Sequence, residues 1–106
     1  MPKYLIEATY TAEGLRGLHK DKASGRRQVV VKAVDSLEGR VEAFYFSMGE
    51  SDVVVIVDVP DAVSVAALSL AASATGLVRV KTTALLSAEE IDRAIDKKLA
   101  YRAPGA

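Results

Sequence analysis

Apolar and polar residues alternate along several stretches of the chain, and this period of two is typical of β-strands. The pattern predicts four strands, over residues 3–10, 40–48, 52–59 and 77–86. The third strand differs from the others, because five consecutive apolar residues, Val53 to Val57, indicate burial on both faces. The sequence therefore predicts a sheet in which this strand is central.

Helical spacing of apolar residues begins only in the second quarter of the chain. A first helix is expected from beyond Gly25 to Leu37, closed by Gly39 as a left-handed C-cap. The preceding segment, residues 11–20, is interrupted by Gly14 and Gly17. We expect that segment to be a loop or a single helical turn.

Two further helices are predicted from capping residues and apolar spacing. One follows the N-cap residue Asp61 and ends at Gly76. Its expected inner stripe consists of small and aliphatic residues, Val63, Ala66, Ala67, Leu70, Ala71 and Ala74. The last helix follows Ser87 and Glu90 at the spacing of a capping box. Its expected apolar stripe is Ile91, Ala94, Ile95 and Leu99.

The predicted order is βαββαβ followed by a helix, which is the ferredoxin-like arrangement of an α+β protein. Right-handed crossovers place the first two helices on one face of an antiparallel sheet, with the first and third strands central. We expect one domain over residues 1–87, and a C-terminal helix with a short tail over residues 88–106.

The other face of this sheet lacks an obvious cover. The second strand carries apolar residues on both of its sides. One side has Phe44, Phe46 and Met48, and the other has Val41, Ala43 and Tyr45. An exposed apolar face of this kind usually marks an interface, so we expect a second copy of the chain to cover it. The alternative is that the C-terminal helix folds back over it, although one short helix is too small for four strands. The second helix carries no charge, which also favours further burial.

Composition and charge exclude several classes of function. Basic and acidic residues number 14 each, so no net field attracts nucleic acid or an anionic membrane. The chain has no cysteine and one histidine, which excludes thiol chemistry and a multi-histidine metal site within one chain. We expect no metal and no cofactor. The N-terminus does not resemble a signal peptide, and we expect a cytoplasmic protein.

Four segments resemble the GYD domain family: KYLIEATY, SGRRQVV, EAFYFSMGESDVVVIVDVPD and SATGLVRVKTTALL. These are small bacterial proteins of the dimeric α+β barrel type with no established activity. The resemblance runs from about Pro2 to Glu90. Gly49 and Asp52 match the naming motif, a glycine and a Tyr-Asp pair, whereas Ser51 stands where the tyrosine is commonly found. The resemblance implies a ferredoxin-like protomer that pairs sheet to sheet, and it implies no substrate.

Arg26, Arg27 and Tyr45 are the candidate ligand-binding residues. Arg26 lies in the apolar stripe of the first helix and needs an anionic partner if buried. It would clamp a carboxylate or phosphate in a cleft between this helix and the sheet, or else reach water or pair with Glu7 or Asp52. Tyr45 would line the same cleft, although aromatic residues on strands are more often part of the core.

Tyr10, His19 and Asp52 are the candidate catalytic residues. A phenol at Tyr10 would orient a carbonyl or act as a weak acid, unless it belongs to the core. His19 would act as a general base, because imidazole exchanges protons near neutral pH, but its loop context favours a solvated side chain. Asp52 would act as a base or pair with an arginine, or else accept hydrogen bonds from nearby N–H groups.

Two functions remain open from the sequence. The first is a homo-oligomeric module that binds or senses a small molecule without catalysis. The second is a cofactor-independent monooxygenase or isomerase that acts on a small apolar substrate in the cleft between the first helix and the sheet. A cavity at that place is needed for the enzyme.

Overall fold

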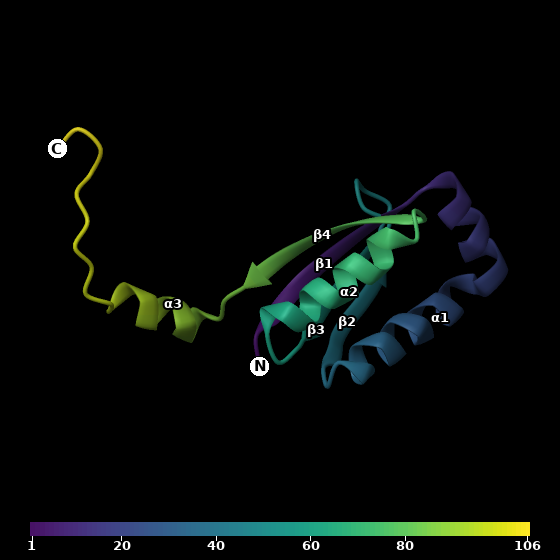
Figure 1. Cartoon of the computed structure of the whole chain (residues 1–106), viewed down its shortest axis with the longest axis horizontal. Helices are drawn as coiled ribbons and strands as arrows, with labels where there is room; N and C mark the ends of the chain where they lie inside the picture. Colours follow the sequence, from purple (N-terminus) through teal and green to yellow (C-terminus); the bar gives the residue numbers. More distant parts are fainter.

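A computed structural model describes all 106 residues and contains one four-stranded antiparallel sheet and three helices. The strands are β1 (Lys3–Tyr10), β2 (Arg40–Phe46), β3 (Val53–Asp58) and β4 (Val78–Leu85), and the helices are α1 (Ala12–Ser36), α2 (Ala62–Ala74) and α3 (Ala88–Ile95). The order across the sheet is β2-β3-β1-β4, so β1 and β3 are central as predicted. Figure 1 shows α1 and α2 on one face of the sheet. The predicted ferredoxin-like α+β arrangement is confirmed.

The hydrophobic core lies between the sheet and these two helices. Successive side chains of a strand point to opposite faces, so every second residue of β1 and β3 faces the helices. Seven apolar residues are buried there, namely Ile6, Val34, Val53, Val55, Val57, Val59 and Val65. Five of the seven belong to the two central strands or adjoin them: three lie in β3, Val59 follows β3 directly, and Ile6 lies in β1. This burial explains why β1 and β3 are central.

The helix α1 begins much earlier than the sequence predicts, so the expected loop over residues 11–20 is wrong. Thr11 is the N-cap, and its hydroxyl accepts a hydrogen bond from the N–H of Gly14 at 3.1 Å. Gly14 is buried, and a Cβ at this position would overlap the carbonyl oxygen of Leu77. This glycine therefore allows α1 to approach the start of β4 closely, and it does not interrupt the helix.

The end of α1 also differs from the prediction. Glu38, with φ of 60°, is the residue in the left-handed conformation, and Gly39 is not. A Cβ on Gly39 would lie 2.5 Å from the carbonyl oxygen of Asp58. Glycine is thus needed at Gly39 because the chain passes close to the end of β3, and not because of its φ.

A β-bulge in β2 determines which face of the sheet each aromatic residue of this strand occupies. The register against β3 shifts between Val41 and Ala43. Because of this shift, Val41 and Phe44 lie opposite core valines and pack against the core. Tyr45, opposite Val54, lies on the other face and is 71% exposed.

The inner stripe predicted for α2 is wrong, because the six residues assigned to it do not include those that meet the sheet. Val65 is buried, Leu68 packs against the core, and the hydroxyl of Ser69 lies 2.9 Å from that of Thr82. The predicted stripe instead forms what we call the outer face of α2, namely Val63, Ala66, Ala67, Leu70, Ala71 and Ala74, all exposed. The sequence misleads here because apolar residues surround the whole helix.

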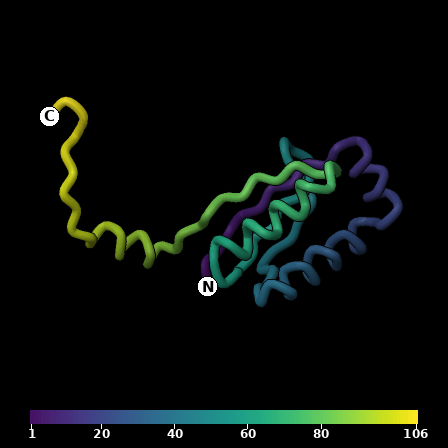
Figure 2. Tube along the Cα trace, in the orientation of Figure 1, coloured from purple at the N-terminus to yellow at the C-terminus, as the bar shows by residue number.

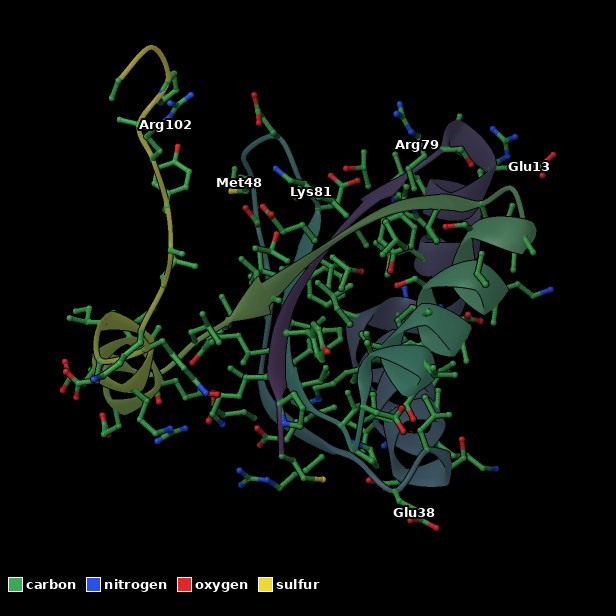
Figure 3. The ribbon with its side chains drawn as sticks, turned by 60° about the vertical axis from the view of Figure 1, so that its left-hand side comes forward. Glu13, Glu38, Met48, Arg79, Lys81 and Arg102 are labelled. Atoms are coloured by element: carbon green, nitrogen blue, oxygen red, sulfur yellow. The ribbon has the colours of Figure 1, made fainter.

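The face of the sheet opposite the helices, which we call the open face, has no covering layer. Its centre is formed by half-buried apolar residues of all four strands, Leu5, Ala43, Val54, Ile56 and Leu85. Arg79 and Lys81 flank this centre on β4, and Figure 3 shows Lys81 on the side of the strands away from the helices. The expected uncovered face is therefore present in the single chain.

The helix α3 does not fold back over the open face. The capping box at its start is confirmed, with Glu90 N–H to Ser87 Oγ at 3.1 Å and Ser87 N–H to Glu90 Oε1 at 2.9 Å. The helix ends at Ile95, so the predicted stripe residue Leu99 lies beyond it. Figure 2 shows the chain after β4 leading away from the rest of the molecule. We call residues 86–101 the C-terminal arm, and all of them are exposed. No helix in the chain has the length and apolar character that crossing a membrane requires.

Candidate functional site: a cleft between two helices

Two adjoining hollows lie between α1, α2 and the sheet. The apolar hollow has a volume of about 80 Å³, and eleven of the thirteen residues around it are hydrophobic. The polar hollow has a volume of about 150 Å³ and lies between the first half of α1 and the end of α2. Four residues border both hollows, namely Tyr10, Arg26, Ala72 and Val78. We therefore treat the two hollows as one cleft, with its apolar part over the sheet.

A kink in α1 shapes the wall of this cleft. Lys22 has φ of 67° and ψ of 162°, so the helix changes direction there. Leu18 and Asp21 before the kink border the polar hollow, and Val30 after it borders the apolar hollow. The bend therefore brings both halves of α1 to the same cleft.

Arg26 lies where the two hollows meet, and its side chain is 31% exposed. Its nearest acidic partner is Asp21, with 3.9 Å between Nη1 and Oδ2. This distance is too long for a hydrogen bond, so Asp21 does not engage the N–H donors of Arg26. A guanidinium in this position presents a planar set of donors that suits a carboxylate. The expected ion pair of Arg26 with Glu7 or Asp52 is not formed, because the acidic residue near Arg26 is Asp21.

Tyr10 and Asp52 are linked, but they have different roles. The backbone N–H of Tyr10 donates to Oδ2 of Asp52 at 2.8 Å, and the ring of Tyr10 lies against Gly14. The Asp52 backbone also bonds to Ala8 and Ser47, each at 2.8 Å. Asp52 thus holds the ends of β1 and β3 together and does not border the cleft, whereas Tyr10 does.

The other three candidate residues lie outside the cleft. His19 is exposed on α1, where its Nδ1 lies 2.9 Å from the carbonyl oxygen of Leu15. Arg27 and Tyr45 border a separate open hollow of about 340 Å³ at the edge of β2. The structure therefore brings Tyr10 and Arg26 together and leaves His19, Arg27 and Tyr45 apart from them.

Some residues of the cleft were not found from the sequence. Asp21 and Leu18 were overlooked because their segment was expected to be a loop. Ala72, which borders both hollows, was overlooked because the inner stripe of α2 was assigned to the opposite side. No signal in the sequence identifies Asp21, because it comes near Arg26, five residues later, only through the kink at Lys22.

A second group of charged residues gathers at one end of the open face. The buried carboxylate of Asp58 accepts from Lys3 Nζ at 2.7 Å and from Arg40 Nη2 at 2.8 Å. These bonds, that from Lys3 first, lower the pKa of the Asp58 carboxyl. Lys3 also donates to Glu42 at 2.6 Å, and its two acidic partners raise its pKa. This cluster fixes the ends of three strands, and none of its residues borders the hollows described here.

The remaining polar features of the open face are weaker. The hydroxyl of Ser51 donates to Glu7 Oε2 at 3.4 Å. These two residues border an open hollow of about 340 Å³ together with Arg79 and Lys81, the residues labelled on β4 in Figure 3. No group of three or more histidine, aspartate or glutamate side chains is placed to hold a metal ion.

The fold and the cleft define a ferredoxin-like α+β protein with a small, mainly apolar cavity on its helical side. The sequence profile of the GYD domain family matches residues 4–95, which is most of the chain. The chain belongs to the GYD domain family. Neither a curated protein nor a solved structure matches it significantly.

Proposed function

We propose that this GYD domain protein is a homo-oligomeric module that binds a small carboxylic acid with a compact apolar body in the cleft between α1 and α2. One observation carries the proposal: Arg26 is the charged residue shared by the apolar and the polar hollow, and Asp21 does not occupy its donors. An anionic group beside Arg26 would leave the rest of the molecule in apolar surroundings.

The size of the cleft limits the ligand. The polar hollow, at about 150 Å³, resembles in volume an engineered protein cavity that takes up one benzene ring. The apolar hollow beside it is smaller, at about 80 Å³. A short branched or aromatic carboxylic acid fits these dimensions, whereas a nucleotide or a long-chain lipid does not.

Binding without catalysis is favoured over the monooxygenase or isomerase. The acid–base candidates His19 and Asp52 do not border the cleft, and Asp52 already accepts from the N–H of Tyr10. Asp21 and the phenol of Tyr10 are the titratable acids beside it. Arg26 and the phenol of Tyr10 are sufficient to orient the carboxylate of a ligand, and a sensing role requires no more.

The homo-oligomer is supported by the open face. Its apolar centre is half-buried in one chain without any layer above it. A single ferredoxin-like protomer has only α3 left to cover it, and α3 stands clear. Pairing of two open faces would bury this centre and leave both clefts on the outside.

Two measurements test the ligand. Native mass spectrometry of freshly purified protein is expected to show a retained small acid, and calorimetry is expected to show binding of benzoate but not of benzyl alcohol. Arg26→Gln should weaken benzoate binding by about tenfold or more, because a charge-assisted hydrogen bond contributes about 1.5–3 kcal/mol. The neighbouring variant Arg27→Gln is the matched control, since Arg27 lies outside the cleft.

A second pair of variants tests the place of binding. Ala72→Leu fills the region where the two hollows meet and should abolish benzoate binding, whereas Ala71→Leu on the exposed side of α2 should not. Equal binding by Arg26→Gln and Arg27→Gln, or unchanged binding by Ala72→Leu, would contradict the proposal.

A further inference from the structure

We propose that the ligand of the cleft is a free α-amino acid with a short branched apolar side chain, which binds Arg26 through its carboxylate and Asp21 through its ammonium group. The inference rests on the proposed function, because it assigns a second charged group to the carboxylic acid beside Arg26. It goes further than that proposal, since it requires a zwitterion.

The cleft contains one cation and one anion. Asp21 borders the polar hollow, Arg26 borders both hollows, and no other charged residue borders either of them. The two side chains are 49% and 31% exposed, so water screens their charges only in part. Oδ2 of Asp21 and Nη1 of Arg26 lie 3.9 Å apart, which is too far for a hydrogen bond. The cleft therefore offers two opposite charges side by side, each with hydrogen-bonding capacity left for a ligand.

An acid that carries only a carboxylate does not match both charges. Beside Arg26 its carboxylate would also lie close to Asp21, and like charges in a partly water-excluded hollow repel each other. An ammonium group on the neighbouring carbon atom changes this repulsion into attraction, because Asp21 then accepts a charge-assisted hydrogen bond from it. A zwitterion thus engages both side chains and adds no net charge to the cleft.

The C-terminal end of α2 also favours a cation in the polar hollow. Ala72 in its last turn and the C-cap residue Thr75 border this hollow together with Asp21. Figure 1 shows this end of α2 beside the first half of α1. The C-terminal end of a helix carries a partial negative charge, and the last turn of α2 has no basic residue of its own. The helix end and Asp21 therefore act in the same direction on an ammonium group.

The apolar hollow suits the side chain of the amino acid. Eleven of its thirteen lining residues are hydrophobic, and Arg26 is the charged residue among them. Its volume of about 80 Å³ favours an isopropyl or isobutyl group. The carboxylate would then lie at the junction of the hollows, the ammonium group in the polar hollow and the side chain in the apolar one. This arrangement favours valine or leucine over larger amino acids.

Calorimetry of the full chain with matched ligands tests each group of the amino acid. L-Valine should bind about fivefold or more tightly than 3-methylbutanoate, which has the same carbon skeleton without the ammonium group. Glycine lacks the apolar side chain, and 2-methylpropylamine is valine without its carboxylate. Both should bind about tenfold or more weakly than L-valine, because each loses one of the contacts in the cleft.

The variant Asp21→Asn tests the anion of the cleft. The amide keeps the shape of the side chain and removes its charge, so L-valine should bind about fivefold or more weakly. Binding of 3-methylbutanoate should not weaken, because the repulsion from Asp21 is also removed. Asp35→Asn is the control, since it is the same change at an exposed position of α1 outside the cleft and should alter neither ligand. Circular dichroism checks that both variants fold.

The two proposals fail in different ways. If 3-methylbutanoate binds as tightly as L-valine, or if only benzoate binds, the amino acid is wrong and the small carboxylic acid remains. The same conclusion follows if Asp21→Asn leaves L-valine binding unchanged or weakens both ligands equally. If none of these ligands binds the parent chain, or if Arg26→Gln binds them as the parent does, both proposals are wrong.

Discussion

Asp58 shows how one buried charge is made tolerable. A carboxylate without partners in a dry environment would take up a proton, because burial disfavours the charged form. Here Lys3 and Arg40 both donate to it, from β1 and from the start of β2. Their own side chains are 41% and 67% exposed, so water still screens the cations. The net effect favours the carboxylate and joins three strands at one end of the sheet.

Asp58→Asn should lower the melting temperature at pH 7 by about 5 °C or more. The variant loses the charge of the buried carboxylate, which accepts one hydrogen bond from Lys3 and one from Arg40. The pKa of Asp58 is lowered from its ordinary value of 3.8, so the stabilisation is complete from about pH 5 upward, one unit above that value. It is lost as the pH falls through the lower, folded-state value. Thermal melts at several pH values should therefore show the two proteins converging in acid.

Asp61→Asn is the control for this measurement. Asp61 is exposed and caps α2 by accepting the N–H of Ser64 at 2.8 Å. Asparagine caps a helix about as well as aspartate, so this variant should melt within a few degrees of the parent. A loss as large as that of Asp58→Asn would show that the buried ion pairs are not the cause.

At the scale of elements, the kink of α1 is the feature that shapes the cleft. Lys22 takes a backbone conformation that is essentially confined to glycine, with φ of 67° and ψ of 162°. Such a conformation costs about 1–3 kcal/mol in a residue with a side chain. The packing of both halves of α1 must offset this cost, because Gly14 approaches β4 and Val34 is buried in the core.

Lys22→Gly should raise the free energy of unfolding by about 1 kcal/mol, because glycine adopts this conformation without strain. Lys20→Gly, two residues earlier at an ordinary helical position, should lower it by about 1 kcal/mol. Urea denaturation measures both. Changes of the same sign would mean that the helix is not kinked at Lys22 in solution.

The elements that were predicted correctly depend on short-range signals. The alternation in β1 and β4, the apolar run of β3, the N-cap Asp61 and the capping box of α3 are all visible within a few residues of sequence. The errors arise where a contact with a residue far away in the sequence determines the local structure. Gly14 faces Leu77 and Gly39 faces Asp58, and neither contact can be read from neighbouring residues.

The candidate site was predicted in part for the same reason. Arg26 stood out because a cation interrupts an apolar stripe, and Tyr10 because it ends a strand of the core face. Asp21 gave no such signal, and the partner of Arg26 was sought on the strands. The sequence also gave no signal for the orientation of α2. Alanine, valine and leucine occur on all sides of this helix, so no side is clearly more apolar than the others.

At the scale of the whole molecule, the uncovered sheet is the surface on which the proposed pairing of two copies depends. The single chain measures 57 × 33 × 23 Å, and the long dimension includes the arm. Its open face carries an apolar centre between charged ends, Lys3 with Asp58 at one end and Arg79 with Lys81 at the other. Charged ends of this kind restrict the ways in which two copies can pair.

Thr83→Lys should convert the dimer that we propose into a monomer at micromolar concentration. Thr83 is exposed on the open face in the row of Leu5, so a lysine there does little harm to one chain but places a charge between two. Gln28→Lys, an exposed change of equal charge on α1, is the control. Light scattering after gel filtration gives both masses, and a dimer of Thr83→Lys would mean that this face is not the contact.

The helix α2 links these scales. Its inner side borders the ligand cleft at Ala72 and meets Thr82 of β4 through Ser69, and the other side of β4 belongs to the open face. A ligand that shifts this helix on entering the cleft would therefore act on the strand at which we propose that two copies pair. Thermodynamic reciprocity then requires that any tightening of assembly by the acid be matched by an equal tightening of acid binding as the protein is concentrated.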